Sequence, residues 1–231
     1  MARHALLVGG TRGIGAALAA DLLAAGWTVT LASRSTRAAD LEALGATWVQ
    51  CDASDPEACA ALVAGLPPVD ALVLCAGPYH RVPFFEETAD GWRGMFANNL
   101  DPVFFLGQAV LPGMRERGWG RILTFSMSNA SKLQANPRVA AHYVAKAGVV
   151  ALTRTLARIG ANRGVTANCI SPGFVDSGSA PAEELAEMVP KIPAGRVGKM
   201  DEVVALARFL LSDQASYVNG ADVPISGAWG L

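Results

Sequence analysis

Residues 8–15 read Val8-Gly9-Gly10-Thr11-Arg12-Gly13-Ile14-Gly15. An apolar run of strand length, Ala5–Val8, precedes this stretch, and a segment with helical periodicity, Gly15–Ala25, follows it. Glycines let a backbone approach a pyrophosphate closely, and a helix N-terminus offers the pyrophosphate N–H donors and a positive potential. The stretch therefore predicts a dinucleotide site on the turn between a first strand and a first helix.

Short apolar runs recur along the rest of the chain without the alternation of a half-exposed strand. They lie at Thr28–Ala32, Thr47–Cys51, Ala71–Cys75, Arg121–Phe125, Thr166–Ile170 and Asp222–Ile225. Helical segments are expected at Gly15–Ala25, Asp55–Ala64, Trp92–Arg117, Val139–Arg163 and Asp201–Leu211. Strands covered on both faces and alternating with helices form parallel sheets. We expect an α/β Rossmann fold, a doubly wound parallel sheet of about seven strands with helices on both faces.

Length and composition narrow the class of protein further. The chain of 231 residues is long enough for one full core but too short for a separate substrate domain, so residues 1–231 are expected to form one domain. The net charge of -1 and dispersed Lys and Arg argue against a nucleic-acid partner. No apolar stretch reaches the roughly 20 residues of a membrane helix, and the cysteines lack metal-ligand spacing. We expect a cytoplasmic protein with reduced thiols, no metal and no membrane partner.

Four further segments give the chain a family resemblance that covers almost its whole length. Together with the glycine stretch, which is similar to Thr-Gly-x-x-x-Gly-x-Gly apart from Val8, they resemble the short-chain dehydrogenase/reductase family. The segments are Cys51-Asp52-Ala53-Ser54, Leu74-Cys75-Ala76-Gly77, Asn99-Leu100 and Ser171-Pro172-Gly173-Phe174-Val175-Asp176-Ser177. In the second segment both family asparagines are replaced. The resemblance, which extends to 3-oxoacyl-carrier-protein reductases, implies an oxidoreductase acting on a small carbonyl or alcohol. It also implies a homotetramer or homodimer paired through Trp92–Arg117 and Val139–Arg163.

Charge at the end of the second strand predicts which dinucleotide binds. An acidic residue there would repel a ribose 2′-phosphate, whereas this chain has Ser33 followed by Arg34. Arg12 in the glycine turn would form the other side of a guanidinium clamp around that phosphate. We therefore expect NADP(H). The predicted cofactor-binding residues are Gly9, Thr11, Arg12, Gly13, Ile14, Gly15, Ser33, Arg34, Asp52, Ala53, Ala76, Gly77, Lys146, Pro172, Gly173, Phe174 and Ser177.

The catalytic residues that the resemblance implies are irregular in this chain. In the family a Tyr exchanges the proton and a Lys four residues later lowers its pKa, but Tyr143 and Lys146 are three residues apart. If Lys146 keeps its place, His142 occupies the Tyr position and Tyr143 is turned by about 100° around the helix. Residues three apart can still be neighbours on a helix, so Tyr143 with Lys146 is preferred over His142, which is a competent proton donor near neutral pH. A third reading leaves His142 facing solvent or a partner subunit.

The serine of the family site is also displaced. Met127 falls where that serine is expected, with Ser126 and Ser128 on either side. Neighbouring residues of a strand point to opposite faces, but a bulge or an early strand end would bring Ser128 into the site. The predicted catalytic set is therefore Tyr143, Lys146, Asn99 and Ser128.

The substrate end and two rival functions complete the expectations. Tyr79-His80-Arg81, with Met127, Phe174 and Trp229, would suit a flat or acyl carbonyl compound near a cation. The Pro/Gly-rich stretch Ser171–Gly198 is expected to be a long irregular insertion and is a candidate lid. The altered Tyr-to-Lys spacing equally fits a catalytically reduced dinucleotide-binding protein, a sensor or structural subunit. A lyase or isomerase that uses His142 as a base is the third alternative.

Overall fold

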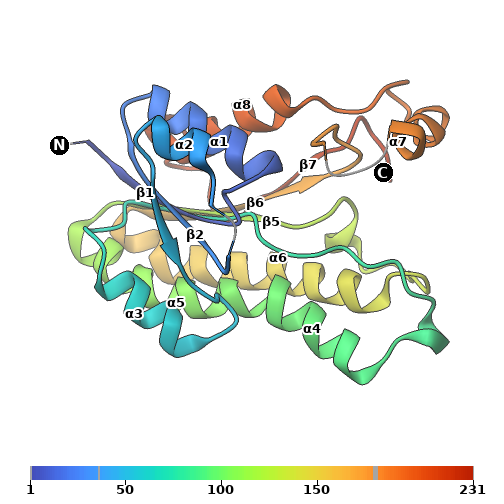
Figure 1. Cartoon of the computed structure of the whole chain (residues 1–231), viewed down its shortest axis with the longest axis horizontal. Coiled ribbons are helices and arrows are strands. Elements are labelled where there is room, and N and C mark those ends of the chain that lie inside the picture. The colour runs from blue at the N-terminus through green and yellow to red at the C-terminus, as the bar shows by residue number, and fades with distance from the viewer. Residues whose placement is uncertain (1, 36, 179–181, 231) are drawn as a thin grey trace.

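The computed structural model describes residues 2–35, 37–178 and 182–230. Within these residues seven parallel strands form one sheet in the order β3-β2-β1-β4-β5-β6-β7, and the predicted Rossmann fold is confirmed (Figure 1). The strands are β1 (His4–Val8), β2 (Thr28–Ser33), β3 (Thr47–Gln50), β4 (Ala71–Leu74), β5 (Gly120–Phe125), β6 (Val165–Pro172) and β7 (Asp222–Ile225). The order reverses between β1 and β4, and such a reversal opens a crevice beyond the carboxyl ends of the strands.

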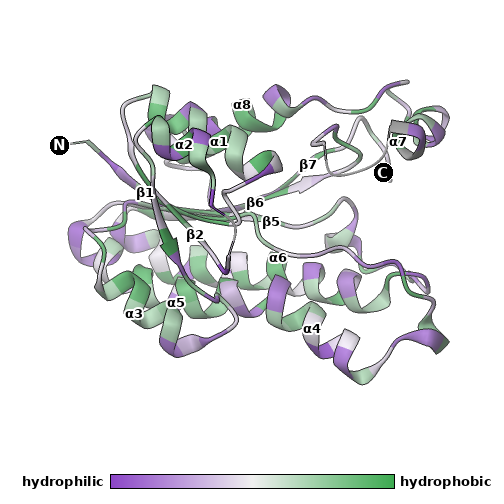
Figure 2. Cartoon of the chain, viewed as in Figure 1, coloured by the Kyte–Doolittle hydropathy of each residue, from purple (hydrophilic) through white to green (hydrophobic). Residues whose placement is uncertain are grey.

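Helices cover both faces of this sheet. One layer holds α1 (Gly13–Ala24), α2 (Ala39–Ala43) and α8 (Met200–Leu211), while the other holds α3 (Pro56–Ala64), α4 (Ala89–Asn99), α5 (Asp101–Arg117) and α6 (Ala140–Gly160) (Figure 1). Strand β1 shows why its sequence is apolar from Ala5 to Val8. Leu6 and Val8 pack in the hydrophobic core on one face of the sheet and Ala5 and Leu7 in the core on the other. Figure 2 colours the same ribbon by hydropathy.

Local chemistry sets several helix ends. At the start of α3, the side chain of Asp55, the residue before Pro56, accepts a hydrogen bond from Glu57 N. At the start of α4, the side chain of Thr88 accepts one from Gly91 N. Helix α4 ends at Asn99 and α5 begins at Asp101, because Pro102 has no N–H to continue the ladder. The helical segment expected at Trp92–Arg117 is thus divided at Leu100 between α4 and α5.

The structure departs from the sequence expectations at two short elements. Ser171–Gly198, expected to be irregular throughout, contains the helix α7 (Ala182–Met188) followed by a 3₁₀ turn at Val189–Lys191, and this expectation was wrong. Helix α2, with five residues, is too short to leave a periodic signal. Over the described residues, none of the helices has the length and apolarity needed to span a membrane.

Candidate functional site

The glycine turn forms the floor of the site. Strand β1 ends at Val8 and α1 begins at Gly13, so residues 9–12 turn the chain from sheet to helix. A Cβ on Gly15 would lie only 2.4 Å from the Gly9 carbonyl oxygen, which shows how closely the first turn of α1 packs on the loop. Only glycine allows this approach, and the turn is left narrow enough for a pyrophosphate to sit on its backbone.

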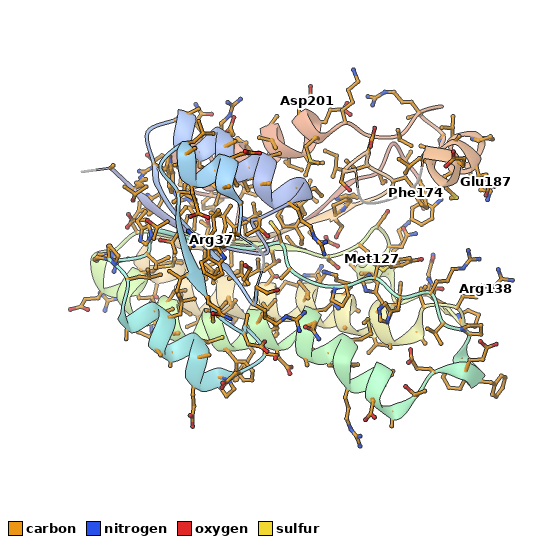
Figure 3. The ribbon with its side chains drawn as sticks, in the orientation of Figure 1. Arg37, Met127, Arg138, Phe174, Glu187 and Asp201 are labelled. Carbon is orange, nitrogen blue, oxygen red and sulfur yellow. The ribbon has the colours of Figure 1, made fainter. Side chains whose placement is uncertain are left out.

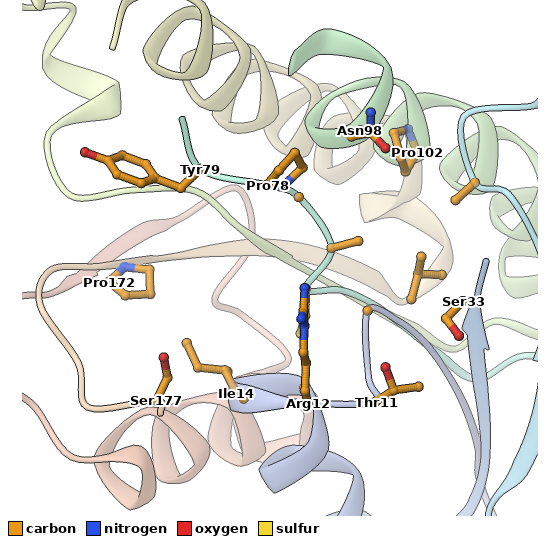
Figure 4. Close-up of a pocket in the computed structure, with 18 of the residues that line it drawn as sticks. Thr11, Arg12, Ile14, Ser33, Pro78, Tyr79, Asn98, Pro102, Pro172 and Ser177 are labelled. Atoms are coloured by element: carbon orange, nitrogen blue, oxygen red, sulfur yellow. The ribbon is translucent and has the colours of Figure 1, made fainter. Parts of the chain in front are cut away.

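A cleft of about 1090 Å³ opens at the carboxyl ends of the central strands, between the glycine turn and the Pro78–Tyr79 segment (Figure 4). Its volume is at the upper end of the range for ligand sites. Sixteen of the seventeen residues predicted to bind the cofactor line it. They are Gly9, Thr11, Arg12, Gly13, Ile14, Gly15, Ser33, Arg34, Asp52, Ala53, Ala76, Gly77, Pro172, Gly173, Phe174 and Ser177.

One end of the cleft is polar and carries two arginines. Arg12 rises from the glycine turn into the cleft, and Ser33 lies at the same end, next to Arg34 (Figure 4). The Ser33 hydroxyl accepts a hydrogen bond of 2.9 Å from Trp48 Nε1. Asp52 accepts hydrogen bonds from the Ser54 hydroxyl and amide, and these bonds lower the pKa of its carboxyl. This end offers cations for a phosphate and a fixed carboxylate beside them.

The opposite end of the cleft is apolar and aromatic. Phe174 and Trp229 meet edge to face with ring centroids 4.9 Å apart, and both line the cleft with Met127. Met127 and Phe174 lie beyond the strand ends, between the two helical layers (Figure 3). Tyr79 also lines the cleft, whereas His80 and Arg81 are not among the described residues that do. The structure therefore brings together most of the predicted substrate end but leaves His80 and Arg81 exposed outside it.

The first turn of α6 places His142, and not Tyr143, in the cleft. His142 lines it with 6% of its surface exposed, and its ring meets Tyr79 at a centroid distance of 5.1 Å. The Tyr143 hydroxyl donates to the Asn129 carbonyl and accepts from Gln134 N, both at 2.8 Å. Within the described residues Tyr143 does not line the cleft. The sequence-based preference for Tyr143 thus finds no support in this geometry, because the one-residue shift turns the phenol to another side of the helix.

Lys146 and Asn99 lie directly behind Gly77 and do not line the cleft among the described residues. A Cβ on Gly77, whose φ is +142°, would lie 2.1 Å from Asn99 Oδ1 and 3.4 Å from Lys146 Nζ. Lys146 Nζ donates to the Phe125 carbonyl at 2.9 Å, and burial lowers its pKa to about 8. Asn99 Oδ1 is buried without a hydrogen-bond partner among the described residues. Both groups are thus one layer behind the cleft wall, and only a glycine at position 77 leaves room for them.

The serines flanking Met127 are both engaged. Ser126 Oγ donates to the Lys146 carbonyl at 2.8 Å, and Ser126 does not line the cleft among the described residues. Ser128 Oγ lines the cleft but donates to the Trp229 carbonyl at 3.0 Å. Ser128 therefore lies in the cleft wall, but its hydroxyl proton is already used in the hydrogen bond to Trp229.

Sequence reasoning missed several lining residues, namely Ser35, Pro78, Ala97, Asn98, Pro102, Gly178 and Leu185. Leu185 belongs to α7, the helix that was not expected. Asn98 and Pro102 flank the break between α4 and α5, and the break was the signal that could have placed them here. Among the described residues no group of three or more His, Cys, Asp or Glu side chains is arranged to hold a metal.

The sequence and the fold of this chain are similar to those of known reductases and dehydrogenases. A family profile described as enoyl-(acyl carrier protein) reductase matches residues 8–228. An acetoacetyl-CoA reductase of Shinella zoogloeoides is 37% identical over 98% of each chain. A 3-oxoacyl-(acyl-carrier-protein) reductase FabG of Salmonella typhimurium is 32% identical over 96% of this chain and 95% of its own. A solved structure titled "short chain dehydrogenase/reductase family protein" superposes with a TM-score of 0.89 at 32% identity, covering 97% and 96% of the two chains.

Proposed function

Because this chain belongs to the short-chain dehydrogenase/reductase family of oxidoreductases, we propose that it transfers a hydride between NADP(H) and a carbonyl or alcohol substrate. The single observation that carries the proposal is the two-ended cleft. Its polar end holds Arg12 and Arg34, and its apolar end holds Met127, Phe174 and Trp229. A long molecule with phosphates at one end and a flat ring at the other matches this division.

The fit of the cofactor rests on three features of the cleft. The close approach of Gly15 to Gly9 leaves backbone N–H groups of the first helical turn facing a pyrophosphate. Arg34 and Arg12 would pair with a 2′-phosphate, and Asp52 with its lowered pKa would remain an acceptor. Pro172, Gly173 and Ser177 would hold the carboxamide end. When bound, the nicotinamide supplies or accepts the hydride.

The preference for NADPH over NADH follows from the end of β2. A carboxylate there would accept hydrogen bonds from a ribose 2′-hydroxyl and repel a phosphate, but Ser33 and Arg34 line this part of the cleft instead. The guanidinium of Arg34 gains an additional charge-assisted contact only when a 2′-phosphate is present. The cofactor preference is therefore an electrostatic property of residues 33 and 34.

For the substrate we propose a 3-oxoacyl thioester or a related small ketone. The names of the relatives describe reduction of such compounds, and the ring pair of Phe174 and Trp229 with Met127 offers an apolar wall to an acyl chain. The proposal is tested by following nicotinamide absorbance with NADPH or NADH and a panel of acetoacetyl-CoA, simple ketones and quinones. Binding of NADPH without oxidation by any of these would overturn it.

A dinucleotide-binding protein with reduced catalysis remains the second candidate function. It is favoured by one observation, that Met127 and His142 line the cleft where the family pattern has a serine and a tyrosine. The same assay separates the two functions, because this candidate requires NADPH to bind while every member of the panel stays unreduced.

We further propose that the protein assembles as a homotetramer or homodimer in the cytoplasm. Helices α4, α5 and α6 expose the large apolar side chains Trp92, Phe104, Val144 and Ile159, each 40% or more accessible. Pairing these helices between subunits would bury that surface. Light scattering after gel filtration would give the mass, and a monomer at micromolar concentration would contradict the assembly.

A further inference from the structure

One buried polar atom in the wall of the cleft lacks a partner. Nδ1 of His142 has no hydrogen-bond partner among the described residues, although only 6% of the residue's surface is exposed. A buried nitrogen without a partner costs free energy, so such an atom needs an explanation such as a ligand or a catalytic role. Because His142 lines the cleft, a molecule entering from solvent is the partner that the geometry leaves open.

The other hydroxyl groups near this end of the cleft are committed or turned away. Tyr143 uses its hydroxyl as donor to Asn129 O and as acceptor from Gln134 N, and Ser128 donates to Trp229 O. The Tyr79 ring carries its hydroxyl at the end away from Pro78 and away from Ile14 and Arg12 (Figure 4). Among these residues, His142 is therefore the one whose ring leaves a nitrogen unpaired for proton exchange with a substrate oxygen.

We propose that His142 is the catalytic acid–base of this enzyme and that Tyr143 is a structural residue that closes the turn at residues 129–134. This inference rests on the proposed oxidoreductase function and names the group that handles the proton. Residues 142 and 146 are four apart on α6, so both lie on the same face of the helix. On this proposal, the shortened Tyr-to-Lys spacing means that histidine has replaced tyrosine as the proton donor and that the site remains active.

The proton step balances with groups already described. In the reducing direction the carbonyl carbon takes up the hydride and the π electron pair of the C=O bond moves to oxygen. That oxygen forms an O–H bond as a ring N–H bond of the His142 imidazolium breaks. The neutral imidazole then regains a proton from solvent water. In the oxidising direction the neutral ring accepts the alcohol proton and later releases it to water.

The charges around the ring set the pH range of this step. Burial, the Lys146 ammonium on α6 and His80 after β4 together lower the pKa of His142 to about 4, with burial as the largest cause and the Pro78 carbonyl opposing part of the shift. Met127 and Ser128, which follow β5, line the same cleft and carry no charge. The ring is therefore neutral above about pH 5 in the cofactor-free protein, and reduction is expected to accelerate as the pH falls, whereas alcohol oxidation is favoured at neutral and higher pH.

The decisive experiment compares His142→Gln with Tyr143→Phe. Glutamine keeps hydrogen-bonding groups but cannot carry a proton between oxygens, and phenylalanine removes only the hydroxyl of Tyr143. With NADPH and acetoacetyl-CoA we expect His142→Gln to lower kcat by about 100-fold or more and to flatten its pH profile. We expect Tyr143→Phe to retain kcat within about fivefold and to melt at a lower temperature.

Two further measurements keep the test independent of folding and of turnover. His142→Tyr introduces a different proton donor at the same position, and we expect partial recovery of kcat over His142→Gln with a profile shifted to higher pH. The chain has three histidines, so the ring of His142 can be followed by NMR in the cofactor-free protein. We expect it to titrate well below the value of a free histidine.

The outcomes separate this inference from the proposed function. If wild type reduces substrates with NADPH, while His142→Gln retains kcat and Tyr143→Phe loses it, the acid–base assignment is overturned and the oxidoreductase function stands. If the ring titrates like a free histidine, it is not buried in the wall and the assignment also falls. If wild type binds NADPH and turns over no substrate, the proposed function itself is overturned.

Discussion

The rings of Tyr79 and His142 meet edge to face, with centroids 5.1 Å apart and planes at 88°. The two residues come from different elements, the loop after β4 and the first turn of α6, and both line the cleft. Tyr143, the neighbour of His142 on the same helix, instead has its hydroxyl bound by Asn129 and Gln134. One step along the helix thus separates a side chain in the cleft from one that serves the fold.

Removing the Tyr79 ring should expose His142 to water. Burial is the largest cause of the low pKa of His142, so Tyr79→Ala is expected to raise that pKa toward the ordinary value. NMR titration of the ring in the cofactor-free protein measures the change. Phe84→Ala is a control, because Phe84 is an exposed aromatic residue of the same connection that does not line the cleft in the described residues. An unchanged pKa in Tyr79→Ala would show that Tyr79 does not shield the ring.

Stability should depend on pH through the same histidine. The pKa of His142 is lowered to about 4 in the folded protein, so the unfolded chain binds more protons between about pH 4 and 6.5 and stability rises with pH across that window. His142 alone is expected to make the wild type less stable at pH 4 than at pH 7 by up to about 3 kcal/mol.

Urea unfolding of wild type and His142→Gln at several pH values between 4 and 8 measures this difference. The variant should lose less stability on acidification than the wild type does, because it lacks the histidine with the lowered pKa. Parallel pH curves for wild type and His142→Gln would contradict the low pKa.

Cofactor preference should follow the charge of Arg34. Arg34→Gln removes the guanidinium proposed to pair with the 2′-phosphate, and one charge-assisted hydrogen bond contributes about 1.5–3 kcal/mol. We expect NADPH to bind about 10- to 100-fold more weakly and NADH binding to change little. Arg37→Gln is the matched control, since Arg37 lies in the same loop but pairs with Glu42. Equal weakening of NADPH and NADH in Arg34→Gln would refute the role, and fluorescence titration reports both affinities.

The glycine turn should not accept a methyl group at Gly15. A Cβ there would lie 2.4 Å from the Gly9 carbonyl oxygen and 2.8 Å from Gly10 Cα, so backbone has to move. Gly15→Ala is expected to abolish measurable NADPH binding in calorimetry while the far-UV circular dichroism remains helical. Gly94→Ala on α4, where a Cβ would meet nothing within 4 Å, should bind like wild type and be slightly more stable. Wild-type affinity in Gly15→Ala would contradict the proposed pyrophosphate site.

The fold was predictable because its signals are local and repeated. The central strands are mostly apolar runs buried on both faces, as Leu6 and Leu7 show by packing in opposite cores, and the glycine turn fixes where the first crossover begins. Helix α7 was missed because the Pro/Gly-rich composition around it hides seven helical residues. Helix α2 was missed because five residues make little more than one turn.

The sequence located the proposed cofactor end of the cleft better than it located the proton donor. Residues on the glycine turn or at a strand end, such as Gly13 and Pro172, were expected at the cofactor site, and the structure places them in the cleft wall. The proton donor depended on a rotation of about 100° between neighbouring helical residues. The spacing in the sequence allowed either Tyr143 or His142 as the proton donor. Only the structure showed that His142 lines the cleft while the Tyr143 hydroxyl bonds the Asn129 carbonyl.

The most direct test of the account is NADPH oxidation by the wild-type protein with acetoacetyl-CoA, followed at the nicotinamide absorbance and repeated with NADH. We expect turnover with NADPH and a kcat/KM at least tenfold lower with NADH, since Arg34 lines the end of the cleft that we propose for the 2′-phosphate. NADPH that binds but stays unoxidised with acetoacetyl-CoA, ketones and quinones alike would contradict it.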